Sequence, residues 1–471
     1  MRTTASGLTG RLIELVTDTG QHPSAEVTDL VERAVVDTVA VSLAARDDEG
    51  VRAGFEALAE PVRDGCSTVL LTGERTSAAQ AALLGGLAAH ALDYDDVDDI
   101  LLGHPSAVLV PALLACAEEI DASGPDLVDA FWVGLRAGRI VSTVVGIGPH
   151  YSAGWHSTSS LGSIAAAAAV ARLRALSERE TANALGIAGS LAAGSRQNFG
   201  TMTKPLHAGW AAEIGIRATR LASTGFTADS HQLEGPLGFL ALHGGSSLDP
   251  AQHDSILDAA HGLELPAVNL KLYPCCYYTH SGAEAALRLA QDGLRAQDCE
   301  RLVVSVQKGG LAPLIHHRPR TGLEAKFSME YVVAVALLDG EIVLRSFSDE
   351  QVARQEPQAL LRRVEVHEVP TPPVGGPAED AFTVIEAHTS AGVVSSRVDR
   401  ALGHATRPVP DSRLRDKWAD CLSTWSGSDV DGAFELLRGI GRAPSLREVA
   451  ARLTELLGSR TAVTNDQRGI A

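Results

Sequence analysis

Apolar side chains recur at helical spacing from the start of the chain to about residue 265. Behind Ser24, which can cap a helix, they follow every three or four residues through Ala45, the spacing of one face of an α-helix. Similar spacing returns at residues 77–92, 106–121, 127–146, 158–175, 178–193 and 206–224. Glycines and short polar runs separate these segments, so we predict a packed array of helices.

The pattern changes after about residue 265, where short β-branched segments occur. Runs with strand character occupy residues 302–306, 363–369, 382–388 and 393–398. Turn residues separate them, and Ser390-Ala391-Gly392 is expected to close a hairpin between the last two. Helical spacing persists at residues 281–292 and 327–338, so this part is predicted to be an α+β unit.

The chain returns to helical spacing beyond His404, through DSRLRDKWADCLSTW and SLREVAARLTELL. The simplest arrangement that fits this pattern is a mainly α protein in which both ends of the chain build one large helical domain. We therefore predict that residues 1–265 and 405–471 form this domain and that residues 266–404 form a smaller, inserted α+β domain.

Composition limits the classes of protein to which the chain can belong. Hydrophobic residues make up 45% of the 471 residues and charged residues 21%, which suffices for a large core and excludes a disordered chain. The formal net charge of −18 argues against nucleic acid or an anionic membrane as a partner. Any anionic substrate would have to be attracted by a local basic pocket.

Cysteine usage and targeting signals indicate the cell compartment. The six cysteines are scattered without a C-x-x-C pair, as expected in a reducing cytoplasm. No apolar run approaches the length of a membrane span, and the first residues lack the basic start and long apolar stretch of a signal peptide. We expect a soluble, cytoplasmic protein.

Four predicted helices begin close to a histidine, twice with a lysine nearby. The segments are GHPSAVLVPALLACAEEI with His104, GWHSTSSLGSIAAAAAVARL with His156, TMTKPLHAGWAAEIGI with Lys204 and His207, and NLKLYPCCYYTHSGAEAAL with Lys271 and His280. Helix N-termini present unpaired N–H groups and the positive end of the helix dipole, which favour anions. One such histidine is usually only a cap, but four favour a shared site for a small carboxylate.

An acidic run from Asp93 to Asp99 follows the predicted helix that ends near His90. Its carboxylates can serve as a general acid or base, can form a metal cluster, or can simply face water, as charge runs usually do. Asp93 precedes His104 by only eleven residues, so one loop can bring both to the same helix start. There Asp93 would raise the basicity of His104 and fix its tautomer.

The same run contains D-D-x-x-D at Asp95, Asp96 and Asp99, a diphosphate–magnesium motif of class I terpene synthases. The second metal motif of those enzymes is not evident, and aromatic residues, at 4%, are too few to line a carbocation cavity. No histidine or cysteine pair has the spacing of a zinc site, and neither G-x-G-x-x-G nor a P-loop occurs. We therefore expect no metal and no nucleotide cofactor.

The segment Lys271-Leu272-Tyr273-Pro274-Cys275-Cys276 lies where the pattern changes, close to the expected domain junction. Clefts between domains are common substrate sites. The adjacent cysteines are interpreted as buried thiols or as a proton donor, because adjacent cysteines rarely chelate one metal. Tyr273, Cys276 and His280 are candidate substrate-binding residues, together with His207.

Five segments resemble, in order and spacing, the motifs of MmgE/PrpD proteins: AHALDYDDVDDILLGHPSA, GWHSTSSLGS, FGTMTKPLHAG, KLYPCCYYTH and HHRPRTGLEAKFSMEYVVAVAL. The resemblance covers nearly the whole chain. The family includes 2-methylcitrate dehydratases, cis-aconitate decarboxylases and iminodisuccinate epimerases. It implies a large all-helical domain formed by both termini, a smaller α+β lid domain, a homodimer, and catalysis without metal or organic cofactor.

The resemblance also implies site residues. The positions that match the family's active site at the domain junction are Asp93, His104, His156, Lys204 and Lys271. Two departures concern the reaction, because Val97 stands where decarboxylase relatives have Thr and Cys276 stands where they have His. The segments TKPLH and GHPSA nevertheless resemble the decarboxylase and epimerase branches more than the methylcitrate dehydratases.

The reactions of the family share one demand, the movement of a proton or a carboxylate at a carbon alpha to a carboxylate. The developing charge needs fixed cations, for which we choose Lys204 and Lys271. His104, tuned by Asp93, and His156 are chosen as general base and acid. We predict a lyase that dehydrates or decarboxylates a small di- or tricarboxylate. An epimerase of an iminodisuccinate-like dicarboxylate is the close alternative, and a non-catalytic carboxylate-binding protein is the alternative from another class.

Overall fold

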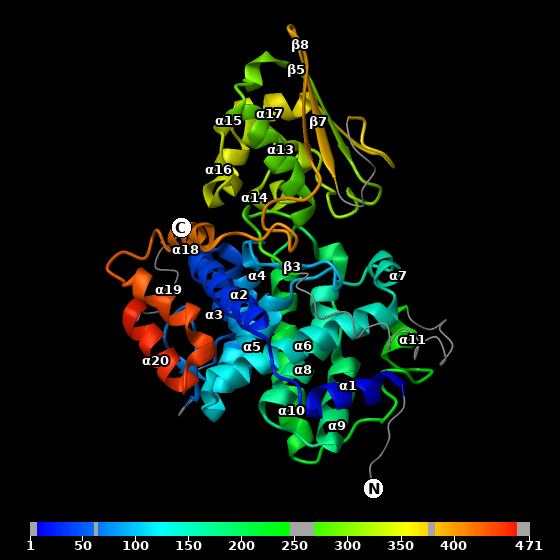
Figure 1. The fold of residues 1–471 in the computed structure, drawn as a ribbon, viewed down its shortest axis with the longest axis vertical. Helices are drawn as coiled ribbons and strands as arrows, with labels where there is room; N and C mark the ends of the chain where they lie inside the picture. Colours follow the sequence, from blue (N-terminus) through cyan, green and yellow to red (C-terminus); the bar gives the residue numbers. More distant parts are fainter. Residues whose placement is uncertain (1–6, 61–64, 245–267, 375–381, 459–471) are drawn as a thin grey trace, which may run out of the picture. The chain divides into compact units, whose positions relative to one another are not determined.

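The computed structural model describes residues 7–60, 65–244, 268–374 and 382–458. The chain divides into two compact units. The helical unit contains the described residues of Met1–Asn198, Met202–Val268 and Pro410–Ala471, and the mixed unit contains those of Phe199–Thr201 and Asn269–Val409. Helices dominate and the sheets are small (Figure 1), so the predicted mainly α fold class is confirmed.

Helices from both ends of the chain build the helical unit. The first part supplies α1 (Gly7–Thr17), α2 (Ala25–Ala44), α3 (Glu49–Leu58), α4 (Ala78–Ala91), α5 (Pro105–Ile120), α6 (Gly124–Val145), α7 (Ile147–Ser152), α8 (Ser157–Leu173), α9 (Glu178–Leu191), α10 (Thr203–Ser223) and α11 (Phe239–His243). The C-terminal part supplies α18 (Asp411–Cys421), α19 (Val430–Arg438) and α20 (Leu446–Leu457). The short strands β1 (Ser67–Thr68), β2 (Arg75–Thr76) and β3 (Val97–Asp98) lie in its loops. The helices predicted from apolar spacing in this part are confirmed.

None of the described helices has both the length and the apolar character that a membrane crossing requires.

Small residues allow the central helices to pack closely. A Cβ atom on Gly86 of α4 would lie 2.7 Å from the Cα atom of Gly209 of α10, and one on Gly209 would collide with the carbonyl oxygen of Leu83. The two backbones therefore approach each other only because both positions are glycine. The alanine-rich α8, whose residues from Ser157 to Ala171 are all buried, packs against α6 and α10. This packing brings α4, α8 and α10 together around the polar residues described below.

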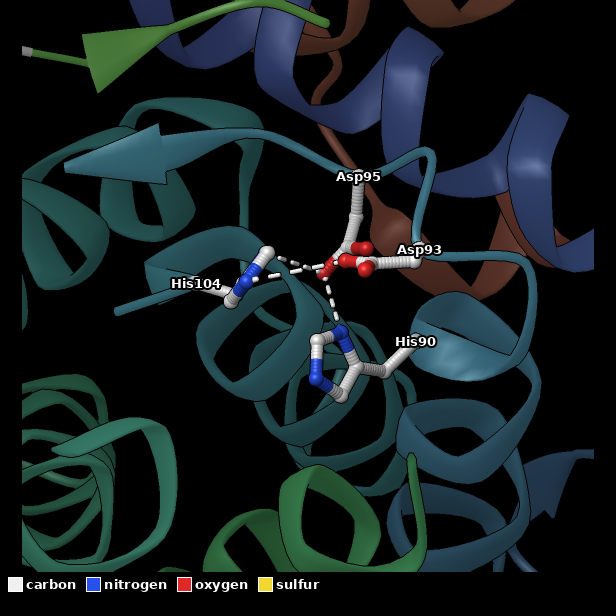
Figure 2. Close-up of side chains that lie close together, drawn as sticks. All are labelled: His90, Asp93, Asp95 and His104. Atoms are coloured by element: carbon white, nitrogen blue, oxygen red, sulfur yellow. Dashed lines mark hydrogen bonds and ion pairs between the residues drawn. The ribbon is translucent and has the colours of Figure 1, made fainter. Parts of the chain in front are cut away.

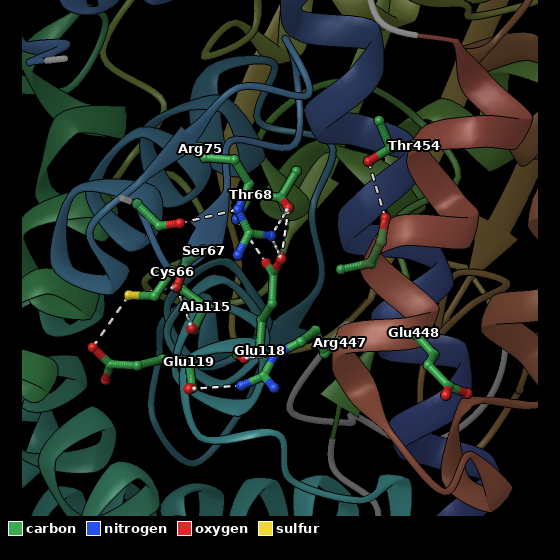
Figure 3. A network of polar contacts seen from close by, with 12 residues as sticks. Cys66, Ser67, Thr68, Arg75, Ala115, Glu118, Glu119, Arg447, Glu448 and Thr454 are labelled. Carbon is green, nitrogen blue, oxygen red and sulfur yellow. Dashed lines mark hydrogen bonds and ion pairs between the residues drawn. The ribbon is translucent and has the colours of Figure 1, made fainter. Parts of the chain in front are cut away.

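Polar contacts fasten the C-terminal helix α20 and the β1–β2 pair to the same end of α5 (Figure 3). Glu118 of α5 accepts a hydrogen bond from the backbone N–H of Thr68 at 2.6 Å and forms an ion pair with Arg75. Arg447 of α20 donates to the carbonyl oxygen of Glu119 at 3.1 Å. The returning part of the chain is thus held by specific contacts as well as by apolar packing.

The mixed unit contains a four-stranded sheet in the order β6-β5-β7-β8. Its strands are β5 (Cys299–Val306), β6 (Val364–Glu368), β7 (Thr383–Thr389) and β8 (Gly392–Val398), and the short strand β4 (Val268–Asn269) spans the boundary of the units. β5 runs parallel to β6 and antiparallel to β7, which pairs antiparallel with β8. The helices are α13 (His280–Gln291), α14 (Gly322–Ala325), α15 (Met329–Asp339), α16 (Asp349–Val352) and α17 (Gln355–Leu360).

The strands and helices predicted for this part are confirmed, including the hairpin. Thr389 pairs with Gly392 across the β7–β8 turn, and Gly392 has a φ of 127°, a conformation that favours glycine. Apolar side chains of α13, α15 and the sheet form one buried core. The first predicted domain boundary, between residues 265 and 266, lies outside the described residues, and the mixed unit ends at Val409.

Candidate active site

Four aspartates of the acidic run are buried in the helical unit. Asp93, Asp95, Asp96 and Asp98 are each no more than 4% exposed, whereas Asp99 is exposed. The alternative of a solvated loop is therefore wrong for most of this run. Buried carboxylates need charged or hydrogen-bonding partners, and each of the four has different ones.

Asp96 and Asp98 hold the loop to the helices that follow it. Ser106 in the first turn of α5 donates its backbone N–H to Asp96 at 3.2 Å, and its hydroxyl contacts the same carboxyl group. Burial raises the pKa of Asp96 to about 8. Arg139 of α6 donates to Asp98 from Nε at 2.9 Å and from Nη2 at 2.6 Å. Because both oxygens of the Asp96 carboxyl group already contact Ser106, these contacts give no support to a diphosphate–magnesium site.

Asp95 lies between two imidazole rings (Figure 2). Its Oδ2 atom is 2.8 Å from Nδ1 of His90, in the last turn of α4, and 3.1 Å from Nδ1 of His104, the N-cap residue of α5. Burial would raise the pKa of Asp95, but its contacts with His90 and His104 outweigh it and hold the pKa well below its usual value. Asp95 is therefore ionised at neutral pH.

Asp93 has a closer contact with Lys204 than with His104. Its Oδ1 atom is 3.1 Å from Nζ of Lys204 and 3.8 Å from Nε2 of His104. The expected proximity of Asp93 to His104 is present, and Asp95 is a second carboxylate that lies nearer to this ring; the tuning of His104 by Asp93 stays a prediction. Asp93 has a φ of 52°, a left-handed conformation that aspartate tolerates better than most residues. It follows the end of α4, where the backbone N–H of Asp93 donates to the carbonyl oxygen of His90 at 3.2 Å.

Lys204 lies inside the first turn of α10 rather than ahead of it. The helix starts at Thr203, ahead of the predicted segment 206–224, and its first turn accommodates Pro205 because N–H groups there have no intrahelical partner. Lys204 is only 4% exposed, and its ammonium group stands at the positive end of the helix dipole. Asp93 compensates this charge, so the lysine and the helix end together make a place that suits an anion.

His156 and His207 form a second pair of imidazoles. Their Nδ1 atoms are 3.0 Å apart, so one of these nitrogens carries a proton and the other accepts it. His156 is the N-cap residue of α8, and His207 lies in the second turn of α10. Burial and the charge of Lys204 lower the pKa of His156 well below its usual value and that of His207 to about 4. Both rings are therefore neutral at neutral pH.

Ring contacts connect the two pairs into one site. The ring centroid of His90 is 4.3 Å from that of His104 and 5.8 Å from that of His156, and the rings of His156 and His207 are 5.2 Å apart. Burial lowers the pKa of His90 to about 3, so this ring is neutral as well. The helical unit thus brings together five of the residues chosen from the sequence, namely Asp93, His104, His156, Lys204 and His207.

Sequence reasoning missed two residues of this cluster, His90 and Asp95. The sequence marks His90 only as a helix end and Asp95 only as part of an alternative metal motif. A polar side chain in the otherwise apolar run LLGGLAAHAL is a usable signal, because a buried imidazole needs a hydrogen-bonding partner. Nothing in the sequence distinguished Asp95, which contacts two histidines, from the neighbouring aspartates.

The other residues chosen from the sequence belong to the mixed unit. Lys271 is fully buried, and the rings of Tyr273 and His280 are 5.1 Å apart. His280 begins α13, and Cys275 and Cys276 are buried free thiols, in agreement with the sequence interpretation. The roles of Lys271, Tyr273, Cys276 and His280 in substrate binding stay predictions.

The same cluster has the composition of a cation site. His90, Asp93, Asp95 and His104 each offer one ligand atom, all within 4.8 Å of one another, and such nitrogen and oxygen atoms suit a divalent transition metal. The ring nitrogens that face Asp95 lie at hydrogen-bonding distance from it, and a cation would need them without protons. Catalysis without a metal stays a prediction.

Two family models match the chain, the MmgE/PrpD N-terminal domain over residues 15–250 and the MmgE/PrpD C-terminal domain over residues 273–437. The cis-aconitate decarboxylase of Mus musculus is 30% identical over 359 residues, which cover 72% of this chain and 70% of the relative. The cis-aconitate decarboxylase of Homo sapiens is 30% identical over 377 residues, which cover 76% of each chain. That of Aspergillus terreus is 25% identical over 402 residues, or 80% and 81% of the two chains.

These matches, together with the cluster of buried acids, imidazoles and a lysine, define an enzyme. The chain belongs to the MmgE/PrpD family, as the sequence resemblance predicted.

Proposed function

We propose that the protein is a lyase that releases CO2 from a small di- or tricarboxylate of the cis-aconitate type. The observation that carries this proposal is the buried Asp93–Lys204 ion pair, in which the carboxylate oxygen is 3.8 Å from Nε2 of His104. A cation and a proton-transfer group therefore share one buried place. The names of the mouse and human relatives support this substrate class. Dehydration of a related hydroxy acid falls within the same lyase chemistry.

Decarboxylation of such an acid needs a place for an electron pair and a source for one proton. The carbon–carbon bond to one carboxylate breaks, CO2 leaves, and the electron pair spreads over the carbons conjugated with a remaining carboxylate. A proton from the enzyme then adds to carbon and completes the product. Fixed cations stabilise the developing charge because they need no reorganisation during the reaction. We assign this role to Lys204 and, in the mixed unit, to Lys271.

His104 and His156 are the proposed proton-transfer groups. Carboxylate oxygens of Asp95 and Asp93 lie 3.1 and 3.8 Å from the ring nitrogens of His104, and negative charge favours a protonated imidazole. Burial and the charge of Lys204 keep His156 neutral instead. His104 is therefore the proposed proton donor in decarboxylation, and His156 is the proposed acceptor in dehydration, the reaction that removes a proton from carbon.

Further properties belong to the same proposal. His207, Tyr273, Cys276 and His280 are proposed to bind the substrate. The α+β domain is proposed to act as a lid, and the enzyme to work as a cytoplasmic homodimer without metal or organic cofactor. Sedimentation velocity of the purified protein tests the homodimer.

An epimerase of an iminodisuccinate-like dicarboxylate is the second candidate. It is favoured by the presence of two imidazole pairs, His90–His104 and His156–His207, because epimerisation removes a proton on one face of a carbon and returns one on the other. A non-catalytic carboxylate-binding protein is disfavoured, because the relatives are named for an enzymatic activity.

Proton NMR in deuterated water tests the proposal with cis-aconitate, 2-methylcitrate and iminodisuccinate as substrates. Decarboxylation gives CO2 and a new alkene product that carries deuterium at the carbon that received the proton. Dehydration gives a new alkene without CO2, and epimerisation gives deuterium incorporation without net loss of substrate. Deuterium exchange without a new product would favour the epimerase, and the absence of any change in all three acids would contradict both candidates.

A further inference from the structure

Asp95 contacts two imidazoles through one oxygen atom. Its Oδ2 is 2.8 Å from Nδ1 of His90 and 3.1 Å from Nδ1 of His104, and Figure 2 shows the carboxylate between the two rings. The Asp95 side chain is fully buried. The proposed function uses Asp95 only as a negative charge beside His104 and places it in no contact with the substrate, so any effect it has on the reaction must pass through these two neighbours.

The charge of Asp95 determines where the rings carry their protons. An ionised carboxylate only accepts hydrogen bonds, so Nδ1 of His90, which is hydrogen-bonded to it, must be an N–H donor. Nδ1 of His104 is 3.1 Å from the same oxygen, where the negative charge favours a proton on that nitrogen. Burial opposes ionisation of Asp95, yet its contacts with His90 and His104 hold its pKa well below the usual value. Each neutral ring therefore has its proton on Nδ1. The other nitrogen, Nε2, is then left as an acceptor.

The second nitrogen of His104 lies on the side of the proposed substrate cation. Nε2 of His104 is 3.8 Å from Oδ1 of Asp93, and the same oxygen is 3.1 Å from Nζ of Lys204. The backbone N–H of His104 donates to Oγ1 of Thr158 at 3.1 Å, which fixes the start of α5 against α8. The ring is thus held through its Nδ1 while Nε2 stays available for proton transfer.

We propose that Asp95, held in place by His90, is a positioning residue that keeps the proton of His104 on Nδ1 and so makes Nε2 the atom that exchanges protons with the substrate. In decarboxylation, the proton on Nε2 of the His104 imidazolium is transferred to the substrate carbon as CO2 leaves. The ring then keeps its Nδ1–H on Asp95, and Nε2 takes its next proton from water. The exchange with substrate rests on the proposed function, whereas the tautomer is a property of the free enzyme.

His90 stabilises the carboxylate without adding charge. Burial lowers the pKa of His90 to about 3, so the ring is neutral and donates one N–H to Asp95. Its ring centroid is 4.3 Å from that of His104, which leaves little room for the carboxylate to turn away. Replacement of His90 should therefore loosen Asp95 and weaken its effect on His104, but should not abolish it.

The first experiment reads the tautomers directly. Nitrogen-15 NMR of protein with labelled histidines, without substrate and at neutral pH, distinguishes Nδ1–H from Nε2–H rings. His90→Gln and His104→Gln identify the two sets of signals by their loss. We expect an N–H at Nδ1 of both rings, and a His104 ring that carries its proton on Nε2 alone in the wild-type enzyme would overturn the proposal. This result needs no Asp95 variant that folds.

The second experiment compares Asp95→Asn with Asp96→Asn as a matched control. Asp96 is equally buried but contacts Ser106, and burial raises its pKa to about 8. It therefore carries a proton at neutral pH, and asparagine is close in shape and charge to the acid it replaces. Asp95→Asn should lower kcat roughly 10²–10⁴-fold with KM within about threefold. It should also give a mixture of His104 tautomers.

The control should keep both kcat and the Nδ1–H signal. Equal losses of kcat in Asp95→Asn and Asp96→Asn would overturn the proposal, because any buried aspartate of the loop would then serve. His90→Asn should give an intermediate loss of kcat and a partial change of the His104 tautomer. Unchanged kcat and tautomer in both Asp95→Asn and His90→Asn would also count against it.

Two outcomes separate this proposal from the proposed function and from a metal. If His104 shows Nδ1–H and none of the acids turns over, the tautomer control by Asp95 stands and the lyase assignment falls. If one of the acids turns over and His104 carries its proton on Nε2 alone, the lyase assignment stands and the tautomer control by Asp95 falls.

Addition of Zn2+ should leave both Nδ1–H signals in place. Stoichiometric loss of both signals with a gain of activity would show that a cation takes the place of these protons, which overturns the proposal.

Discussion

Lys417 of α18 donates a hydrogen bond to the backbone carbonyl oxygen of Tyr94 at 2.8 Å, and its Nζ atom is 3.9 Å from the centroid of the Tyr94 ring. Tyr94 stands between Asp93 and Asp95 in the chain. The same ammonium group forms a buried ion pair with Asp37 of α2 at 2.6 Å. A helix from the C-terminal part of the chain therefore positions the loop that carries both site carboxylates.

Lys417→Met should destabilise the protein and lower its activity. Removing one partner of a buried ion pair costs roughly 3–5 kcal/mol, because the carboxyl group left behind must either stay charged without a partner or take up a proton. Burial already raises the pKa of Asp37 against the effect of Lys417, so Asp37 will take up a proton once the lysine is gone. Urea unfolding and kcat/KM measure the two effects.

The double variant Asp37→Asn with Lys417→Met is the control. It removes the uncompensated charge and should recover part of the lost stability, while the lost contact to Tyr94 still lowers kcat. Equal stability of Lys417→Met and wild type would show that the ion pair does not hold the return segment.

Lys204→Ala should mainly weaken transition-state stabilisation. The variant removes the cation next to Asp93 at the start of α10, and loss of one group that stabilises developing negative charge costs roughly 2–4 kcal/mol in kcat/KM. Lys308→Met, at an exposed lysine of the mixed unit, is the matched control and should keep wild-type kinetics. A Lys204 variant within about threefold of wild type would exclude Lys204 from the site.

Single changes of His104 and His156 to glutamine should each lower the rate roughly 10²–10⁴-fold, the usual effect of losing a general acid or base. The exposed His231, changed to glutamine, should have no effect. In an epimerase the two variants should differ in kind, because each would lose solvent exchange with one stereoisomer and keep some with the other. A lyase should show no such difference. Unchanged pH–rate profiles in both variants would move the assignment to Cys276 or His280.

The helix starts at His104 and His156 were predictable because the local sequence determines them. Pro105 follows His104 in the first turn of α5, and apolar spacing continues for several turns behind both residues. The start of α10 was predicted less well, because the predicted segment began at residue 206, whereas the helix starts at Thr203 and has Pro205 inside its first turn, where proline is tolerated.

The partners within the acidic run were not predictable from sequence distance. Asp93 is close to His104 in the chain, but its nearer contact is Lys204, 111 residues away. That contact depends on the close packing of α4 and α10 and on the left-handed conformation of Asp93. Neither property can be inferred from a run in which several aspartates follow one another.

Activity should survive exhaustive chelation, and the purified enzyme should contain no stoichiometric metal. The physical reason is that the ring nitrogens of His90 and His104 that face Asp95 carry protons in the proposed tautomers, whereas metal binding requires their lone pairs. Elemental analysis and turnover after dialysis against a chelator check this prediction. Loss of activity on chelation, with recovery on adding Mg2+ or Zn2+, would support the cation site instead.

Buried neutral histidines should make the protein acid-labile, and His150 offers a test outside the site. Its Nδ1 is 2.8 Å from the carbonyl oxygen of His243 and its Nε2 is 2.8 Å from Oγ of Ser160. Burial lowers its pKa from the usual 6.5 to about 4. Above pH 6.5 both the folded and the unfolded chain are neutral at this position, so His150 adds no pH dependence there.

Between 6.5 and about 4 the unfolded chain binds a proton that the folded chain does not. The free energy of unfolding therefore falls as the pH falls, by up to about 1.4 kcal/mol per pH unit for this one group. His150→Gln can keep both hydrogen bonds but has no proton to bind, so its urea-unfolding free energy should fall less steeply over this range. His231→Gln, at an exposed position, is the control and should follow wild type. Equal slopes for His150→Gln and wild type would mean that His150 is already protonated in the folded protein or does not contribute to its acid sensitivity.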